Sequence, residues 1–301
     1  MGSWRTGDGV PYVWQLGAFY RAMETGDFAD AAIEPCTYSC SMGEGTPRRA
    51  RAEALGYDLR RALASMAEAS AAGAADRSDL AEVHYRMHAA SGDWDSAESD
   101  AEQMAAVLMA EKGYAEGFRT TNVHTRALPL LAYAQARRGE FAKASITIDA
   151  TPADCYNCLR VRGQIDALQK NWSGAQYWFE QAVKQGPSLP FVYSDWGAML
   201  MAKGNLDAAI AKFEIAHAKG PHFAEALDLW GEALIAKNRS DLALAKFEEA
   251  NKYAPNWGRL HLKWGEALRW SGDKAGAKEQ FAVAAGLDLT AAEKTELAST
   301  R

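Results

Sequence analysis

The sequence lacks several features that would point to a membrane protein or an enzyme. It contains no run of about 18 apolar residues, so we expect no membrane-spanning helix. The first five residues lack the basic start and apolar stretch of a secretory signal. A nucleophile elbow, a phosphate-cradling glycine loop and the kinase motifs are also missing. The net charge of -6 gives no general attraction to nucleic acid. We therefore expect a protein that is not an enzyme, does not bind nucleic acid and does not insert into a membrane.

The chain does contain a repeat of 34 residues. The five residues Trp-Gly-Glu-Ala-Leu occur at positions 230–234 and again at 264–268. Aligned on this step, five columns recur between residues 156 and 289, occupied in turn by glycine, alanine, phenylalanine, alanine and proline. Their members are Gly163, Gly197, Gly231 and Gly265; Ala175, Ala209, Ala243 and Ala277; Phe179, Phe213, Phe247 and Phe281; Ala182, Ala216, Ala250 and Ala284; and Pro187, Pro221 and Pro255.

These columns predict a helical hairpin in each unit. Alanine, phenylalanine and alanine at i, i+4 and i+7 form one apolar stripe on a helix. Glycine on the preceding helix lets the two backbones approach, and proline ends the second helix because it cannot continue the hydrogen-bond ladder. Polar, glycine-containing segments at 203–209 and 271–277 mark the turns. One hairpin cannot bury its own apolar faces, so neighbouring copies are expected to stack.

The column pattern resembles the tetratricopeptide repeat over residues 156–289. The resemblance implies an all-α fold, a right-handed α-solenoid of stacked antiparallel helix pairs. The chain departs from the family in one column, where tryptophan stands in place of the usual leucine. We interpret Trp196, Trp230 and Trp264 as packing between helices rather than as residues that stack on a ligand.

The regions that flank the four repeats are less regular. Residues 1–155 are predicted to be an irregular helical region with degenerate hairpins, because the turn signal recurs at 25–31, 91–97 and 137–144 with uneven spacing. Within it we expect a loop at 42–47 and one long alanine-rich helix over 48–73. Residues 290–301 are predicted to form a capping helix, with Thr290 and Glu293 at the spacing of a capping box.

The four cysteines allow three interpretations. Cys36 and Cys40 form a C-x3-C pair, and Cys155 and Cys158 a C-x2-C pair. Together they have the spacings of a structural zinc site. Alternatively, each pair forms a disulfide in an oxidising compartment such as the periplasm, or all four are reduced thiols in a cytoplasmic protein. No other cofactor is expected. His84 and His88 lie four residues apart, but no third ligand is identifiable and we assign them no role.

The resemblance also implies which side chains line the concave groove. In the family these are the second, fifth, ninth and twelfth positions of each first helix. The corresponding residues here are Asn157, Arg160, Gln164, Phe191, Ser194, Met201, Glu225, Asp228, Glu232, Arg259, Glu266 and Arg269. The lysines and asparagines with which the family's chaperone-binding members hold a C-terminal carboxylate are absent from the fifth and ninth positions.

The expected function is a protein-protein interaction scaffold that binds a peptide or protein segment in this groove. Glu225, Asp228, Glu232 and Glu266 favour a segment that carries lysine or arginine. Alternatively, these acids keep a helix face soluble or pair with Arg259 and Arg269 within the chain. Two other functions remain open at this point, a sensor that depends on zinc at the four cysteines, and the regulatory part of a longer enzyme or transcription factor.

Overall fold

The computed structural model describes residues 23, 25–28, 42–71 and 77–300. In these ranges the secondary structure is helical and contains no β-strand. None of the described helices combines the length and hydrophobicity needed to cross a bilayer.

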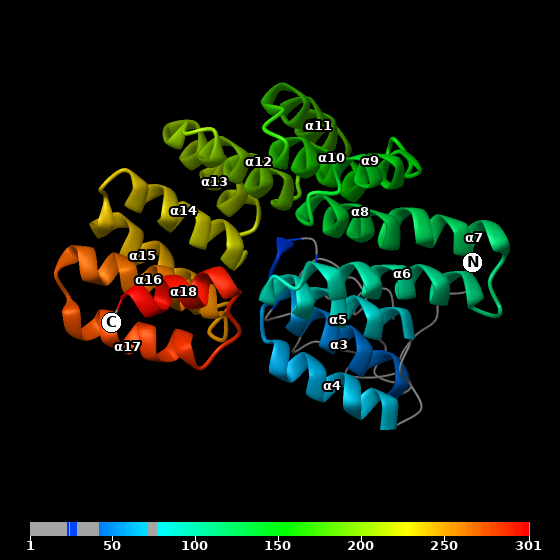
Figure 1. Ribbon diagram of the computed structural model, residues 1–301, viewed down its shortest axis with the longest axis horizontal. Helices are drawn as coiled ribbons and strands as arrows, with labels where there is room; N and C mark the ends of the chain where they lie inside the picture. The colour runs from blue at the N-terminus through cyan, green and yellow to red at the C-terminus, as the bar shows by residue number, and fades with distance from the viewer. Residues whose placement is uncertain (1–22, 24, 29–41, 72–76, 301) are drawn as a thin grey trace, which may run out of the picture.

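The helices form antiparallel pairs that stack in sequence order (Figure 1). The N-terminal pairs are α3 (Met42–Leu55) with α4 (Leu59–Ala71), α5 (Arg77–Ser91) with α6 (Trp94–Ala110), and α8 (Leu128–Arg137) with α9 (Phe141–Asp149). The four repeats supply α10 (Tyr156–Leu168) with α11 (Trp172–Gln185), α12 (Phe191–Ala202) with α13 (Leu206–Lys219), α14 (Ala224–Ala236) with α15 (Ser240–Asn251), and α16 (Gly258–Ser271) with α17 (Lys274–Ala285). A short α7 (Glu116–Asn122) and a π-helical turn (Val123–Ala127) precede α8, and α18 (Ala291–Ser299) ends the stack. The predicted all-α solenoid of stacked helix pairs is therefore confirmed.

The glycine and phenylalanine columns meet inside each repeat. A Cβ atom added to Gly197 would lie 2.4 Å from Cε1 of Phe213, and one added to Gly231 would lie 2.6 Å from Cζ of Phe247. Both phenylalanines are fully buried. The two helices of a repeat therefore approach closely enough that a phenylalanine ring fills the space a side chain on the opposing helix would need.

Turn and cap residues begin and end the helices as the sequence indicates. Gly92 and Gly139 adopt positive φ angles of 75° and 83° in the α5–α6 and α8–α9 turns. The Thr290 hydroxyl accepts a hydrogen bond from the Glu293 amide, and the Glu293 carboxylate accepts one from the Thr290 amide. This capping box starts α18.

Two predictions for the N-terminal region are wrong. Residues 42–47 are not a loop but belong to α3, and residues 48–73 are not one helix, because the chain turns between α3 and α4. At that turn Tyr57 adopts the left-handed conformation, with φ of 62°, which is uncommon for a residue other than glycine. The alanine-rich composition favours helix on both sides of the turn, while Gly56 and Asp58, whose carboxylate accepts a hydrogen bond from the Arg61 amide at 3.3 Å, are the local signals for the break.

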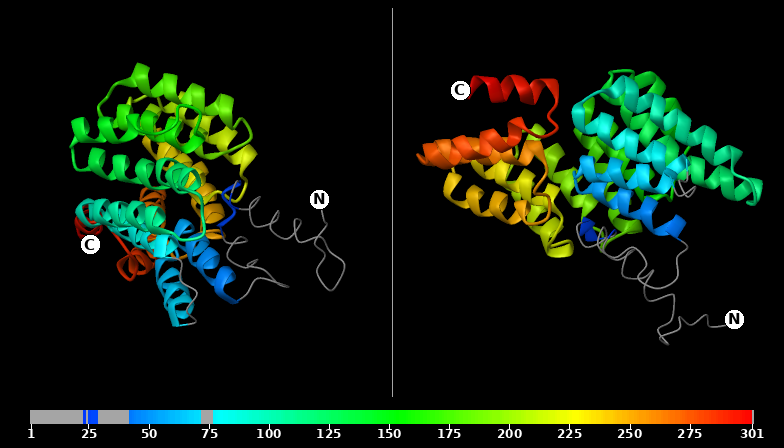
Figure 2. Two further views of the ribbon diagram at one scale, coloured as in Figure 1. Left: turned by 90° about the vertical axis from the view of Figure 1, so that its right-hand side faces the viewer. Right: turned by 90° about the horizontal axis from the view of Figure 1, so that it is seen from below.

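The stack curves into a ring in which the N-terminal pair meets the last repeats (Figures 1 and 2). The Tyr57 ring stacks on Trp257, with centroids 4.0 Å apart and planes 7° from parallel. Asn256 donates a hydrogen bond to Asp58 at 3.0 Å, and Arg60 donates one to the Gly286 carbonyl at 2.7 Å. These contacts join residues about 200 positions apart in the sequence, so the solenoid is closed rather than open-ended.

The repeat tryptophans pack between helices, as predicted. Trp196 lies 6.3 Å from the ring of Phe179 in the preceding repeat and under the ammonium group of Lys212 in its own. Trp230 is covered in the same way by Lys246. Such contacts bury the aromatic ring while the lysine ammonium remains near solvent.

Candidate functional site

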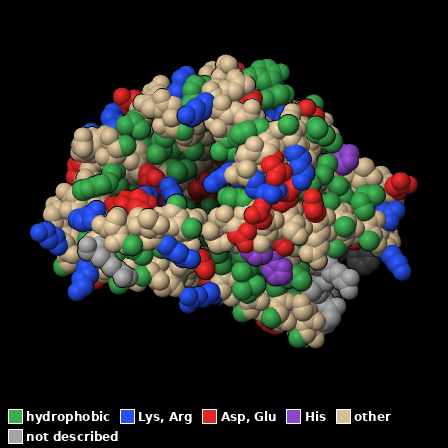
Figure 3. Space-filling model, in the orientation of Figure 1, with side chains coloured by type: hydrophobic (Ala, Val, Ile, Leu, Met, Phe, Trp, Pro, Cys, Tyr) green, Lys and Arg blue, Asp and Glu red, His purple; other side chains and the backbone are tan. Residues whose placement is uncertain are grey.

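The inner face of the ring encloses a cleft of about 770 Å³. It is lined by the first helices of successive pairs, namely α3, α5, α8, α10, α12, α14 and α16, together with the first residues of α4 and α6, the π-helical turn, the start of α18, and Met23 and Phe28. The space-filling view shows the hollow at the centre of this face, with basic and acidic side chains around it (Figure 3). The concave groove predicted for the repeats is thus one wall of a cleft whose other wall is the N-terminal region.

Aromatic side chains line both walls of the cleft. Nine of them contribute to its surface, and they are Phe28, Tyr57, Tyr85, Trp94, Tyr133, Tyr156, Phe191, Phe223 and Trp257. Phe28, Phe191 and Phe223 form a contiguous cluster with ring centroids 5.1 to 6.3 Å apart. Aromatic rings supply a large contact area at a low cost in side-chain entropy, so this surface is suited to holding another molecule.

The N-terminal wall is rich in arginine. Glu82 is buried there and binds Arg51 at 3.0 Å, Arg86 at 2.7 Å and Arg126 at 3.5 Å. Burial alone would raise the pKa of Glu82, but the three guanidinium groups lower it below its ordinary value. One carboxylate therefore holds three arginines, of which Arg126 also binds Asp79 at 3.0 Å.

A fourth arginine on this wall, Arg137, is held by aromatic rings instead of a carboxylate. Its guanidinium carbon lies 4.3 Å from the centroid of Trp94 and 5.8 Å from that of Tyr133. The guanidinium also donates a hydrogen bond to the Tyr133 hydroxyl at 3.2 Å. Trp94 and Tyr133 are themselves in edge-to-face contact. The Arg137 residue is exposed at the surface of the cleft.

On the repeat wall, the first arginine forms an ion pair with a carboxylate of the next repeat. Arg160 on α10 binds Asp195 on α12 at 2.6 Å, and Gln164 donates a hydrogen bond to the same carboxylate at 2.8 Å. The Arg160 guanidinium also lies 5.2 Å from the ring of Phe191. Burial alone would lower the pKa of Arg160, but Asp195 raises it above its ordinary value, so Arg160 is firmly charged.

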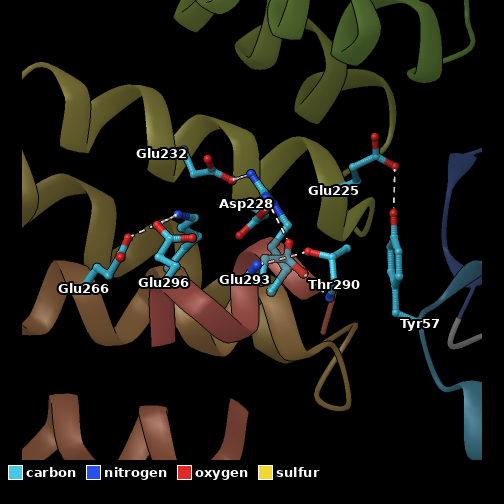
Figure 4. A network of polar contacts seen from close by, with 10 residues as sticks. Tyr57, Glu225, Asp228, Glu232, Glu266, Thr290, Glu293 and Glu296 are labelled. Carbon is cyan, nitrogen blue, oxygen red and sulfur yellow. Dashed lines mark hydrogen bonds and ion pairs between the residues drawn. The ribbon is translucent and has the colours of Figure 1, made fainter. Parts of the chain in front are cut away.

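The acidic residues of the third repeat are paired within the chain (Figure 4). Arg259 reaches back from α16 to Glu232 at 2.5 Å and to Asp228 at 3.6 Å, and forward to Glu293 on α18 at 3.1 Å. Asp228 is completely buried. Burial and the neighbouring Glu232 carboxylate raise the pKa of Asp228 well above its ordinary value, although Arg259 opposes the change.

Asp228 lies within ion-pair distance of Arg259, but neither of its buried carboxylate oxygens accepts a hydrogen bond. Two further acids of this network have hydrogen-bond or ion-pair partners within the chain. Glu225 accepts a hydrogen bond from the Tyr57 hydroxyl at 3.3 Å, across the junction between the two halves. Glu266 binds Lys263 at 3.3 Å, and Lys263 in turn binds Glu296 on α18 at 2.5 Å. The alternative in which Arg259 pairs with the acids inside the chain is therefore the arrangement found. Arg269 does not take part, because it is exposed and its nearest polar contact is the Thr300 carbonyl at 3.5 Å.

Half of the residues that the repeat pattern predicts for the groove line the cleft. These are Asn157, Arg160, Gln164, Phe191, Glu225 and Arg259. The other six do not contribute to its surface, and they are Ser194, Met201, Asp228, Glu232, Glu266 and Arg269. Ser194 and Asp228 are buried, and Met201 packs against the Phe213 cluster. The sequence analysis missed the whole arginine-rich wall, because no repeat register extends into residues 1–155.

The two cysteines within the described ranges form a disulfide, with Cys155 at the N-cap of α10 and Cys158 in its first turn. In that state they offer no thiolates to a metal ion. Cys36 and Cys40 lie outside the described residues, so the four-cysteine zinc site stays an untested prediction. No group of three or more potential ligands that could hold a metal occurs in the described part of the chain. His88 binds Asp100 at 2.6 Å.

No family model and no curated protein matches the sequence. Several solved structures are similar over about half of it. PilF of Pseudomonas aeruginosa has a TM-score of 0.49 at 13% identity, covering 55% of this chain and 77% of its own. PilW, described as a widely conserved type IV pilus biogenesis factor, has a TM-score of 0.47 at 20% identity, covering 55% and 76%. YrrB, described as a TPR protein with an unusual peptide-binding site, has a TM-score of 0.39 at 16% identity, covering 53% and 84%.

Proposed function

We propose that this chain is a non-catalytic interaction scaffold that binds a peptide segment of a partner protein in the central cleft. The observation that carries the proposal is the composition of the lining, which combines nine aromatic side chains with six arginines. Aromatic residues and arginine are the types that are enriched at protein interfaces and dominate their binding energy. The described lining contains no serine, cysteine, histidine or lysine, which are common covalent nucleophiles.

The charge of the partner can be inferred from the charged side chains of the cleft walls that are not already paired within the chain. The sequence favours a segment with lysine or arginine, because of the acids in the third repeat. A basic segment in this structure would have to displace Arg259 from Glu232 and Asp228. That exchange replaces one set of ion pairs by another and gains little net energy. We therefore propose that affinity comes first from the aromatic surfaces, and that a basic partner residue is not the main determinant.

A cleft-filling substitution tests this proposal. Asn157 is exposed and lines the cleft on α10, so Asn157→Trp narrows the cleft without removing a buried contact. Gln176→Trp places the same side chain on the exposed face of α11, outside the cleft, and serves as the matched control. Peptides of about a dozen residues are selected from a random library on the unmodified protein, and their affinities for the three proteins are measured by titration calorimetry.

We expect Asn157→Trp to weaken the selected peptides by about tenfold or more, because an indole occupies the space they need. Gln176→Trp should leave the affinities unchanged. Equal affinities for all three proteins, or a library from which the unmodified protein selects nothing, would refute binding in the cleft.

A further inference from the structure

One arginine of the cleft differs from the other five in how it is held. Arg51, Arg86 and Arg126 bind Glu82, Arg160 binds Asp195, and Arg259 binds its own group of acids. Arg137 has no carboxylate within ion-pair distance among the described residues and rests on Trp94 and Tyr133 instead.

The aromatic contacts leave the guanidinium free to bind a ligand. A ring that stacks on a guanidinium contacts its face, whereas the N–H groups point outward in the plane of the group. One of these N–H groups is used by the Tyr133 hydroxyl. The remaining donors have the fork geometry that matches a carboxylate, and the stacked rings reduce the entropy lost when the arginine binds one.

Three of the five carboxylates that line the cleft bind other arginines, and none of the five lies within ion-pair distance of Arg137. Glu82 holds three arginines, Asp195 holds Arg160 and accepts from Gln164, and Glu293 binds Arg259. The N-terminal wall therefore presents an uncompensated positive charge to whatever enters the cleft.

We propose that Arg137, oriented by Trp94 and Tyr133, forms a subsite of the cleft that binds a carboxylate of the incoming peptide. The carboxylate comes from an aspartate or glutamate side chain or from the peptide's C-terminus, and the chemistry of the contact is the same in both cases. This subsite rests on the proposed function, since it assumes that a peptide occupies the cleft.

Paired peptides and one arginine substitution test the subsite. Each peptide selected on the unmodified protein is made again with its acidic residues changed to the corresponding amides, and separately with an amidated C-terminus. One of the two changes should weaken binding by about tenfold, which is the cost of losing a charge-assisted contact, and the change that does so identifies the source of the carboxylate. In Arg137→Gln both versions of a peptide should bind with equal affinity, because the group that discriminates between them is gone.

Two further variants keep the result interpretable. Arg137→Lys retains the charge but not the planar fork, so it should keep a reduced preference for the acidic peptide. Arg239→Gln removes an exposed arginine that lies outside the cleft and should behave like the unmodified protein. Thermal unfolding followed by circular dichroism checks that Arg137→Gln remains folded.

The outcomes separate the subsite from the proposed function. If Asn157→Trp abolishes binding while Arg137→Gln still prefers the acidic version of each peptide, the cleft binds peptides but Arg137 is not the carboxylate subsite. The same conclusion follows if neither the amide changes nor the amidated terminus weakens binding. If Asn157→Trp has no effect, the proposed function fails and the subsite fails with it.

Discussion

The contact between Gly197 and Phe213 gives the most direct test of how the repeats are built. The ring lies where a side chain on Gly197 would have to lie, with three ring atoms 2.4 to 2.8 Å from the added Cβ. Because Phe213 is fully buried, its ring has no free space into which to move. The two residues should therefore be strongly coupled, and a double-mutant cycle measures that coupling.

The magnitudes follow from opposing contributions. Replacing a glycine by alanine inside a helix gains about 1 kcal/mol of helix propensity. Overpacking against a fixed ring costs about 1–3 kcal/mol, and a distance of 2.4 Å places this site near the upper end. Gly197→Ala alone should thus destabilise the protein by about 1–2 kcal/mol. In a Phe213→Ala background, itself about 3–5 kcal/mol less stable, the clash is gone and the same substitution should stabilise by about 1 kcal/mol.

Urea unfolding followed by far-ultraviolet circular dichroism measures the four free energies of unfolding. Gly117→Ala is the control, because a Cβ added there meets nothing within 4 Å and the substitution should be neutral or stabilising. The expected result is a change of sign for Gly197→Ala between the two backgrounds. If Gly197→Ala changed the free energy of unfolding equally in both, the glycine and the ring would not be in contact and this account of the repeat core would be refuted.

Three further predictions concern ring closure, pH and the cysteines. Tyr57→Ala removes the stack on Trp257, so it should lower the free energy of unfolding by about 1–3 kcal/mol and speed amide hydrogen exchange in α3. Tyr57→Phe keeps the stacked ring and should have smaller effects. Equal hydrogen-exchange rates in the two variants would contradict the closure of the ring. Burial raises the pKa of Asp228, so the folded state binds this proton more tightly than the unfolded state does. The contribution of Asp228 to the free energy of unfolding should therefore fall as the pH rises above about 4, the ordinary pKa of an aspartate. Asp228→Asn should reduce this fall, which urea unfolding at a series of pH values up to about 8 measures. Alkylation without reductant should leave Cys155 and Cys158 unlabelled in mass spectra, and labelling of both would show that they are reduced.

The repeat half of the fold could be predicted because its information is local. Gly231 and Phe247 lie 16 residues apart in the sequence and meet within one helix pair, and the same pair of columns recurs in each unit. Thr290 and Glu293 define the start of the last helix through their own hydrogen bonds. Periodic columns and short-range caps are visible in a single sequence, since the residues that contact each other stand at fixed, short spacings.

The N-terminal half could not be predicted in the same way. The turn between α3 and α4 is made by Tyr57 in the left-handed conformation, and the chain tolerates it there while the ring stacks on Trp257 and the hydroxyl binds Glu225. These partners are 168 and 200 residues away in the sequence. Contacts at such distances leave no local pattern, so the closure of the ring was missed. The helix break does have local signals, Gly56 and Asp58, but the alanine-rich composition on both sides favoured one continuous helix.

The candidate site shows the same division. The positions of Arg160 and Phe191 in the cleft followed from the repeat register, but the register does not state which acids remain available to a partner. Arg259 comes from the repeat after Glu232 and binds it, an alternative that the sequence raised and only the structure could decide. The prediction of a basic partner depended on these acids, and because they are paired within the chain they are not available to bind a lysine or arginine of a partner.

Closure of the ring changes what determines specificity. In an open solenoid the first helices of the repeats would face solvent, and their own side chains would select the partner. Here the irregular half supplies the opposite wall, so any peptide in the cleft contacts both. Most charged side chains of the repeat wall form ion pairs within the chain, as Arg160 does with Asp195 and Arg259 with Glu232. On the other wall Arg137 has no carboxylate within ion-pair distance among the described residues, and Arg51, Arg86 and Arg126 outnumber the Glu82 and Asp79 carboxylates that hold them. On the proposed function, residues outside the repeat register therefore contribute to selecting the partner.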